Sequence, residues 1–302
     1  MDFQKLIEQV TQFEKKTVAV AAAEDLEVLE AISLAVQQNM SSFQLYGDKE
    51  MLTTMLDQHF PHLVKNKQVE IIHTLSQTSS AELAVKAVRQ HEADVLMKGH
   101  IPTSTLLKAV LNKEIGLRTG KVLSHVAVFS VPGYERFIFV TDAAMNIAPD
   151  VSQKAQIIAN AVKVAKSLGL ETPKVAPLAA VEVVNPDMQA SLDAALLTQM
   201  NRRGQITDCE VDGPLALDNA VSMEAAKHKG INSTVAGQAD ILLVPNIESG
   251  NILYKSLVYF SNASVGAVIE GAKAPIVLTS RADSAESKLY SLAVALHSSI
   301  KQ

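Results

Sequence analysis

Short runs rich in valine and isoleucine alternate with amphipathic segments along most of the chain, and this alternation is the strongest constraint on its fold. Parallel strands joined by crossover helices produce such a pattern, because both faces of the sheet are covered by helices. The first third of the chain contains a series of such pairs. The predicted strands are 17–22, 42–46, 69–73 and 94–97, and the helices that follow them are 25–38, 49–59, 80–91 and 103–112. The sequence therefore predicts an α/β fold.

The middle of the chain departs from this repetition. Two strand-like runs, 122–131 and 137–141, are separated by a short segment with a Pro132-Gly133 turn, which predicts an antiparallel hairpin. The later predicted elements are helix 152–168, strand 175–184, helices 188–202 and 216–229, strand 241–244, helix 252–262, strands 265–269 and 276–279, and helix 285–297. We expect a domain boundary near residue 121, where the pattern changes.

Composition narrows the class of protein. A chain of 302 residues, 48% of them apolar, is long enough for two domains. Its net charge of -5 and pI of about 5.9 argue against nucleic acid or an anionic membrane as the main partner. The single cysteine excludes an internal disulfide and favours a reducing compartment. No signal peptide or membrane span is evident, so we expect a cytoplasmic protein.

The familiar nucleotide-binding and hydrolase motifs are absent from the chain. The segment from Met97 to Thr105 is a candidate ligand site of another kind, because it joins a predicted buried strand to a predicted helix. Free backbone N–H groups and the helix dipole favour a bound anion at such a junction. Lys98 and Gly99 would then face a ligand. The alternative is an ordinary turn in which Thr103 caps the helix.

A similar junction lies near the other end of the chain, where Ser280 and Arg281 follow an apolar run. A guanidinium at a helix start can hold a phosphate or an acyl carbonyl through paired hydrogen bonds. The alternative is a capping serine beside an arginine that forms a surface ion pair.

An acidic segment surrounds the Gly213-Pro214 turn and includes Asp208, Asp212 and Asp218. A divalent metal site is one hypothesis for it. Turn formation and stabilisation of a helix N-terminus explain Asp212 and Asp218 without a metal, and we predict no metal site.

A further strand-to-helix junction follows the strand that ends at Val244, where polar residues precede a helix that carries Lys255. These junctions predict one cleft assembled from distant segments.

Taken in order, these segments resemble the phosphate acetyl/butyryltransferase family, most closely its butyryl branch, from about Thr17 to Ser298. The motifs that carry the resemblance are Ala93–Gly99, Leu123–Val126, Val140–Asn146, Val211–Asp218, Gly250–Ile252 with Lys255, and Thr279–Arg281.

The resemblance implies a two-domain fold like that of isocitrate and isopropylmalate dehydrogenases, with the active site in the interdomain cleft. Residues 1–120 and 272–302 would form domain I, and residues 121–271 would form domain II and the dimerisation side. The implied reaction is reversible transfer of a short acyl group, preferably butyryl, between coenzyme A and inorganic phosphate. CoA and phosphate would be substrates, with no cofactor, and a homodimer and functional coupling to an acyl kinase are expected.

The resemblance also implies the site. Ser280, Arg281 and Asp283 are the expected catalytic residues. The expected substrate-binding residues are Lys98, Gly99, Thr103, Ser124, Asp142, Asn146, Asp212, Asn251 and Lys255. In acetyl-specific members an aspartate seven residues after the serine is the proposed base for CoA, but this chain has Ser287 there. A serine cannot act as a carboxylate base, so Asp283 and Glu286 become the nearby candidates.

Three other functions are compatible with parts of the sequence. A phosphate acetyltransferase would differ only in acyl preference. A decarboxylating dehydrogenase of the same fold would need a metal-binding carboxylate cluster and a nicotinamide-binding loop, and no such loop is recognisable. A non-catalytic CoA-binding protein would keep the cleft and lack phosphate-dependent thiol release.

Overall fold

The computed structural model describes residues 2–279 and 283–300, which form two compact units. The terminal unit contains residues 2–121 and the residues from 266 onward, and the central unit contains residues 122–265. Residues 266–271, which the sequence assigned to domain II, thus belong to the terminal unit. Their contacts explain this. Ile269 pairs with Ile276, and the Ala267 N–H donates to Ser291 Oγ, and the two partners, Ile276 and Ser291, lie in the terminal unit.

The terminal unit is built on a sheet with the strand order β3-β2-β1-β4-β11-β10. The strands are β1 (Lys16–Ala21), β2 (Ser41–Gly47), β3 (Val69–His73), β4 (Val95–Lys98), β10 (Ser264–Glu270) and β11 (Ile276–Val277). All pairs among the first five are parallel, and β10 runs antiparallel to β11. The carboxyl ends of β1, β4 and β11 therefore lie at one edge of the sheet.

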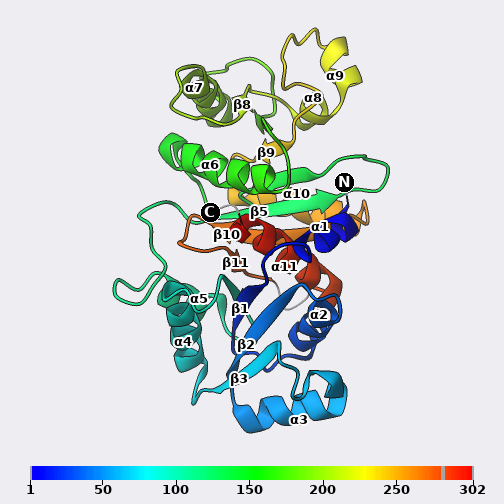
Figure 1. Ribbon diagram of the computed structural model, residues 1–302. Coiled ribbons are helices and arrows are strands. Elements are labelled where there is room, and N and C mark those ends of the chain that lie inside the picture. The colour runs from blue at the N-terminus through cyan, green and yellow to red at the C-terminus, as the bar shows by residue number, and fades with distance from the viewer. Residues whose placement is uncertain (1, 280–282, 301–302) are drawn as a thin grey trace. The chain divides into compact units, whose positions relative to one another are not determined.

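Helices cover both faces of this sheet. They are α1 (Phe3–Val10), α2 (Leu26–Gln37), α3 (Lys49–His59), α4 (Gln77–Arg89), α5 (Thr103–Val110) and α11 (Ala285–Ile300), with a short 3-10 helix, η1 (Pro61–Leu63). Helices α4 and α5 lie on one face, and α1, α2 and α11 lie on the other (Figure 1). Asp25 and Asp48 begin α2 and α3 by accepting backbone N–H groups, as N-cap residues do. The predicted β-α series in this part of the chain is confirmed.

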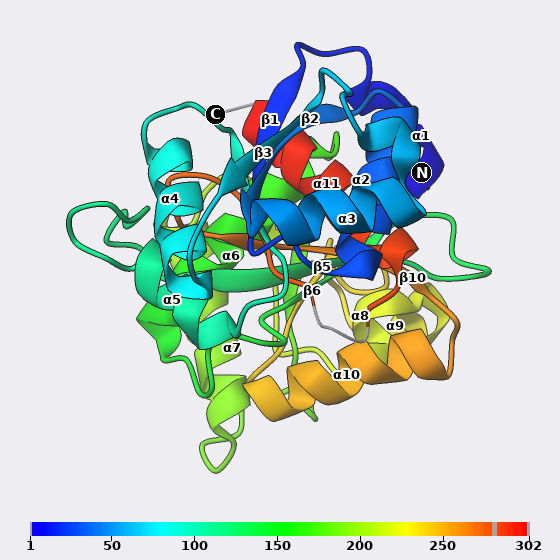
Figure 2. The ribbon, with the colours of Figure 1, turned by 90° about the horizontal axis from the view of Figure 1, so that it is seen from below.

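The central unit contains the predicted hairpin, in which β5 (Ser124–Ser130) and β6 (Ile138–Thr141) pair antiparallel. The strand order is β5-β6-β9-β7-β8, and the pairs after the hairpin are parallel. The remaining elements are α6 (Val151–Ser167), β7 (Lys174–Pro177), α7 (Gln189–Arg202), β8 (Glu210–Val211), α8 (Leu217–Val221), α9 (Met223–His228), β9 (Ile241–Leu243) and α10 (Ile247–Tyr259). Figure 2 shows α10 as a separate straight helix, coloured orange.

Several predicted bounds were wrong for local reasons. The strand expected over 175–184 ends at Pro177, beyond which only an isolated bridge at Leu178 continues. The helix expected over 216–229 is two helices, because Ser222 has an extended backbone and caps the second. Helix α10 begins five residues before the expected Ile252, because Asn246 Oδ1 accepts the Ser249 N–H at 2.9 Å.

Apolar side chains form the core of each unit. In the terminal unit, Val18, Val20 and Leu96 of the central strands are fully buried between the helix layers. In the central unit, Phe129 and Phe139 of the hairpin are fully buried. Within the described residues, no helix is both long and apolar enough to cross a bilayer.

Candidate active site

Lys98 and Gly99 lie at the carboxyl edge of the terminal unit, where β4 ends. The Gly99 N–H donates to the Ala21 carbonyl at 2.8 Å, and the His100 N–H donates to the Ala22 carbonyl at 2.6 Å. These bonds bring the two chain segments into such close contact that a Cβ on Gly99 would lie 2.0 Å from the Ala22 oxygen. A glycine is therefore required here by the backbone approach.

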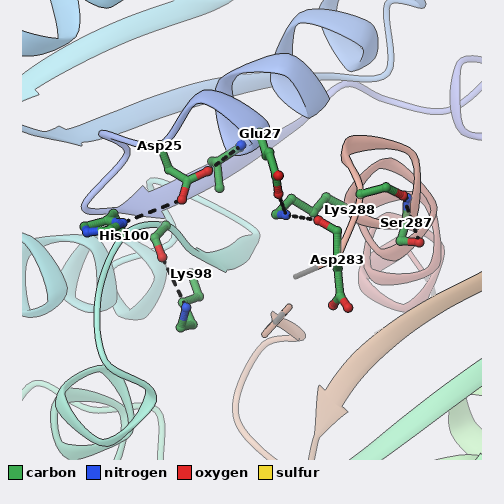
Figure 3. A network of polar contacts seen from close by, with 10 residues as sticks. Asp25, Glu27, Lys98, His100, Asp283, Ser287 and Lys288 are labelled. Atoms are coloured by element: carbon green, nitrogen blue, oxygen red, sulfur yellow. Dashed lines mark hydrogen bonds and ion pairs between the residues drawn. The ribbon is translucent and has the colours of Figure 1, made fainter. Parts of the chain in front are cut away.

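The Lys98 side chain is buried, with 6% of the residue exposed. Its ammonium group donates to the Gly99 carbonyl at 3.2 Å, which folds the side chain back over the end of its own strand (Figure 3). A buried ammonium group beside a helix start is an arrangement suited to an anionic ligand. The structure thus places this cation where the sequence analysis expected it, at a strand-to-helix junction.

Thr103 is the exposed first residue of α5, and the N-cap position is occupied by Pro102, without a side-chain cap. The alternative in which Thr103 caps this helix is therefore wrong, because proline fixes the extended backbone before the first turn. The Thr103 hydroxyl lies at the helix N-terminus, on the same edge of the terminal unit as Lys98.

Asp283 lies two residues before the first residue of α11 in the terminal unit, whereas Ser280 and Arg281 fall outside the described residues. The Asp283 carbonyl accepts a hydrogen bond from the buried Lys288 ammonium group. Figure 3 shows the Asp283 carboxylate on the opposite side of its backbone from α2 and its Glu27 side chain. Of the three predicted catalytic residues, Asp283 is therefore the one that lies within the described residues.

Ser287 and Glu286 are both occupied in local contacts. The Ser287 N–H donates to Ser284 Oγ at 3.2 Å, which is the bond of a capped helix start. Glu286 accepts the Tyr290 hydroxyl at 2.6 Å, and burial and this bond raise the pKa of Tyr290 above its ordinary value. Of the two nearby acidic candidates for a base, Glu286 is thus held against Tyr290 within α11.

A second group of predicted residues lies in the central unit. The buried Asp142 carboxylate accepts the backbone N–H groups of Ala144 and Met145, each at 2.9 Å. It also accepts the Asn146 side-chain amide at 2.6 Å. That amide in turn donates to the Leu123 carbonyl at 2.8 Å. Asp142 and Asn146 therefore shape one rigid turn after β6.

Helix α10 packs against this turn through Gly250. A Cβ there would lie 2.8 Å from the Asp142 carbonyl oxygen, so the motif glycine permits a close helix approach. The next residue, Asn251, is exposed, as is Lys255 one turn later. The Lys255 ammonium group lies 5.8 Å from the centre of the Tyr254 ring. The structure thus brings Asn251 to the same turn as Asp142.

Ser124 and Asp212 are placed differently. Ser124 is fully buried, and its hydroxyl accepts the Asn160 side-chain amide at 2.8 Å. Asp212 follows β8, at the same sheet edge as Asp142, with β9 and β7 between their strands. Its carboxylate lies 3.9 Å from the Arg202 guanidinium, and Asp218 pairs instead with Lys229 at 3.4 Å. The acidic segment does not converge on one point.

Four residues with ionisable side chains at the edge of the terminal unit were not singled out from the sequence. His100 Nδ1 lies 3.7 Å from Asp25 Oδ2, and Lys288 Nζ lies 2.9 Å from Glu27 Oε2. One signal was available for Lys288, which lies four residues before Leu292 on the apolar face of its helix. The other three lie in loops or first helical turns, where periodicity carries no information.

Residues 49–296 match the family described as "Phosphate acetyl/butaryl transferase". The chain belongs to this family. It is 57% identical to a "Probable phosphate butyryltransferase" of Bacillus subtilis (strain 168), covering 98% of this chain and 97% of the relative. It is 49% identical to a phosphate butyryltransferase of Clostridium beijerinckii, covering 97% and 96%.

Two further relatives bear on acyl preference. A phosphate acetyltransferase of Thermotoga maritima is 47% identical, covering 97% of this chain and 98% of that protein. The crystal structure of a branched-chain phosphotransacylase from Enterococcus faecalis V583 is 38% identical, with a TM-score of 0.84, covering 94% of this chain and 99% of the other. The fold and the family are thus supported over nearly the whole chain.

Proposed function

We propose that this chain is a phosphate butyryltransferase that converts butyryl-CoA and inorganic phosphate reversibly into butyryl phosphate and free CoA. The observation that carries this proposal is the near-full-length identity of 57% and 49% with two relatives named for butyryl transfer. Phosphate acyl transfer is the activity common to the family. The four-carbon preference is the more specific part of the proposal.

The edge of the terminal unit supports this chemistry because it can hold an anion. The Lys98 ammonium group is buried beside the tight Gly99 junction, and the N-terminus of α5 begins a few residues later at Thr103. Cations and helix N-termini favour phosphate groups. We assign Lys98, Gly99 and Thr103 to binding phosphate or the anionic groups of CoA.

In the direction of acyl-CoA formation, the CoA thiolate attacks the carbonyl carbon of the acyl phosphate. The carbon–sulfur bond forms, the carbon–oxygen bond to phosphate breaks, and phosphate leaves. We assign the thiol proton to the Asp283 carboxylate, because Ser287 occupies the position of the family base. Ser280 and Arg281 remain the proposed partners of the reacting centre and of the developing oxyanion.

The central unit would supply further substrate contacts. The turn held by Asp142 and Asn146 presents exposed Asn251 and Lys255 from the adjoining helix. We assign these two exposed side chains to direct substrate contact, with Asp142 and Asn146 fixing the turn behind them. Ser124 and Asp212 stay in the proposed site as residues that shape it. The dehydrogenase-like interdomain cleft of the sequence analysis remains part of this proposal.

Helix α10 supports a homodimer formed by the central unit. Of its thirteen residues only Gly250 is buried, while Ile252 and Tyr259 are 67% and 69% exposed and Phe260, which follows it, is 86% exposed. Exposed apolar side chains of this size are typical of an interface with another protein, which would adjoin Lys255 because Lys255 lies on the same face as Tyr259. We propose a second copy of the chain as the occupant, since most soluble oligomers are symmetric homo-oligomers.

The setting of the enzyme follows from its proposed substrates. We propose a cytoplasmic location, where CoA esters are made and consumed and where a single unpaired cysteine is kept reduced. The acyl phosphate product would be used by an acyl kinase. CoA and phosphate are substrates in this scheme, and we propose no further cofactor.

A phosphate acetyltransferase is the second candidate, favoured by the 47% identity with the Thermotoga maritima protein. The two candidates differ in the space around the acyl chain. Butyryl has two more methylenes than acetyl, and each is worth about 1–3 kcal/mol of discrimination in an apolar pocket, so a butyryl pocket should prefer its substrate to acetyl by about thirtyfold or more.

The test is thiol release from acetyl-, butyryl- and isobutyryl-CoA, with and without phosphate. We expect phosphate-dependent release with the highest kcat/KM for butyryl-CoA. Burial raises the pKa of the Cys209 thiol to about 11, so the protein's own thiol will contribute little signal near neutral pH. Preference for acetyl-CoA would support the second candidate, phosphate-independent release would indicate a thioesterase, and no release would indicate a binding protein.

A further inference from the structure

Lys288 carries a buried charge close to the start of α11. The residue is 2% exposed, and its ammonium group contacts two acceptors, Glu27 Oε2 at 2.9 Å and the Asp283 carbonyl (Figure 3). Glu27 lies in the first turn of α2, which follows β1. The lysine therefore connects two helix starts and the segment that enters α11.

Stability alone gives a poor account of a lysine at this position. Transfer of an ammonium group from water to a buried site is unfavourable, and the Glu27 side chain that pairs with it is 52% exposed. The first turn of a helix is also the end where the dipole opposes a cation. Leu289 and Leu292 show that this face of α11 otherwise packs apolar side chains. A methionine would fill similar volume without these costs.

The contact with the Asp283 carbonyl suggests what the lysine does. Asp283 is the residue proposed above as the base, and its backbone has no strand or helix of its own to fix it. The Lys288 side chain binds that backbone and is itself held by Glu27. Glu27 belongs to α2, and the carboxylate of its N-cap residue Asp25 lies 3.7 Å from the ring of His100, two residues after Lys98. The Asp283 backbone is thereby anchored to the edge that carries Lys98.

We propose that Lys288 is a positioning residue, which holds the Asp283 backbone so that its carboxylate is oriented for proton transfer. This inference rests on the function proposed above. Small errors in the placement of a reacting group lower turnover strongly, whereas binding of the substrate through other groups persists. The lysine should therefore affect kcat much more than KM.

The experiment compares Lys288→Met with Lys288→Gln and Glu27→Gln in phosphate-dependent thiol release from butyryl-CoA. Lys288→Met loses both hydrogen bonds, and we expect kcat to fall about tenfold or more, with KM for butyryl-CoA changed less than about threefold. Lys288→Gln keeps a neutral donor for the carbonyl and should retain more activity. Glu27→Gln leaves the Asp283 contact in place and should have the smallest effect.

Lys154→Met is the matched control, because Lys154 is equally buried in the central unit and pairs with Asp193 at 2.5 Å. All variants are assayed well below their own unfolding temperatures, and amide hydrogen exchange of residues 283–287 is measured in parallel. Faster exchange there in Lys288→Met than in Lys154→Met, together with the lower kcat, would support the positioning role.

Two results would overturn the inference. One is a folded Lys288→Met with kcat within twofold of the unmodified chain. The other applies if Lys288→Met does not fold. It is a Lys288→Gln variant whose loss of activity is fully explained by a loss of folded protein and whose amide hydrogen exchange at residues 283–287 is unchanged. Inactivity of the unmodified chain would instead contradict the proposed function, so the two failures are distinguishable.

Discussion

At the scale of single residues, the strongest feature is the cation at the end of β4. Lys98 is buried, and the following Gly99 can carry no side chain because the Ala22 carbonyl lies too close. Sequence reasoning found both residues from their place between an apolar run and a helix. It could not show that the glycine is fixed by contact with a segment more than seventy residues earlier, because that contact exists only in the folded sheet.

Lys98→Met should weaken the use of phosphate. A hydrogen bond to a charged group contributes about 1.5–3 kcal/mol, so we expect kcat/KM for phosphate to fall by about ten- to a hundredfold. Steady-state kinetics with varied phosphate measures this. Lys16→Met is the control, because Lys16 begins β1 at the opposite edge of the same sheet and pairs with Asp94 at 3.2 Å. Equal losses in the two variants would contradict a phosphate role for Lys98.

At the scale of helices and strands, the pattern of the chain predicted most of the β-α series. Elements were placed correctly where apolar spacing was regular, as in α3, whose bounds of 49 and 59 are as predicted. Errors arose at features set by single side chains. Asn246 starts α10 early, and Ser222 divides the predicted helix 216–229. Periodicity carries no signal for such caps when the flanking residues remain compatible with a helix.

The site was less predictable than the fold. Ser124 is expected to bind substrate only from the family resemblance, and nothing in the sequence indicates that its hydroxyl is buried and accepts the Asn160 amide. Lys288 lies on an apolar helix face in the sequence, but its charge meets Glu27 from a segment far earlier in the chain. Both contacts join side chains from different helices, strands or loops, and the pattern of a single sequence does not show which of these side chains come together in the fold.

Helix α10 carries the prediction that belongs to this scale. If its exposed face joins two copies, Ile252→Glu should place an unpaired charge in the interface and give a single-chain mass near 32.4 kDa. Light scattering after gel filtration measures this. Leu75→Glu is the control, since Leu75 is 90% exposed in the terminal unit and should leave the dimer intact. A dimeric Ile252→Glu variant would show that α10 is not the interface.

At the scale of the whole molecule, each unit presents polar segments at the carboxyl ends of its parallel strands. In the terminal unit these are the segments with Lys98 and Asp283, and in the central unit they are the segments with Asp142 and Asp212. Loops at this edge of α/β sheets are where ligands commonly bind.

The most direct test of the proposed function is the identity of the phosphorus-containing product. Butyryl-CoA and inorganic phosphate are incubated with the enzyme, and phosphorus NMR is compared with the amount of thiol released. Our account predicts butyryl phosphate in an amount equal to the free CoA. Release of CoA with inorganic phosphate unchanged and butyrate as the product would contradict it, because the acyl group would then have passed to water.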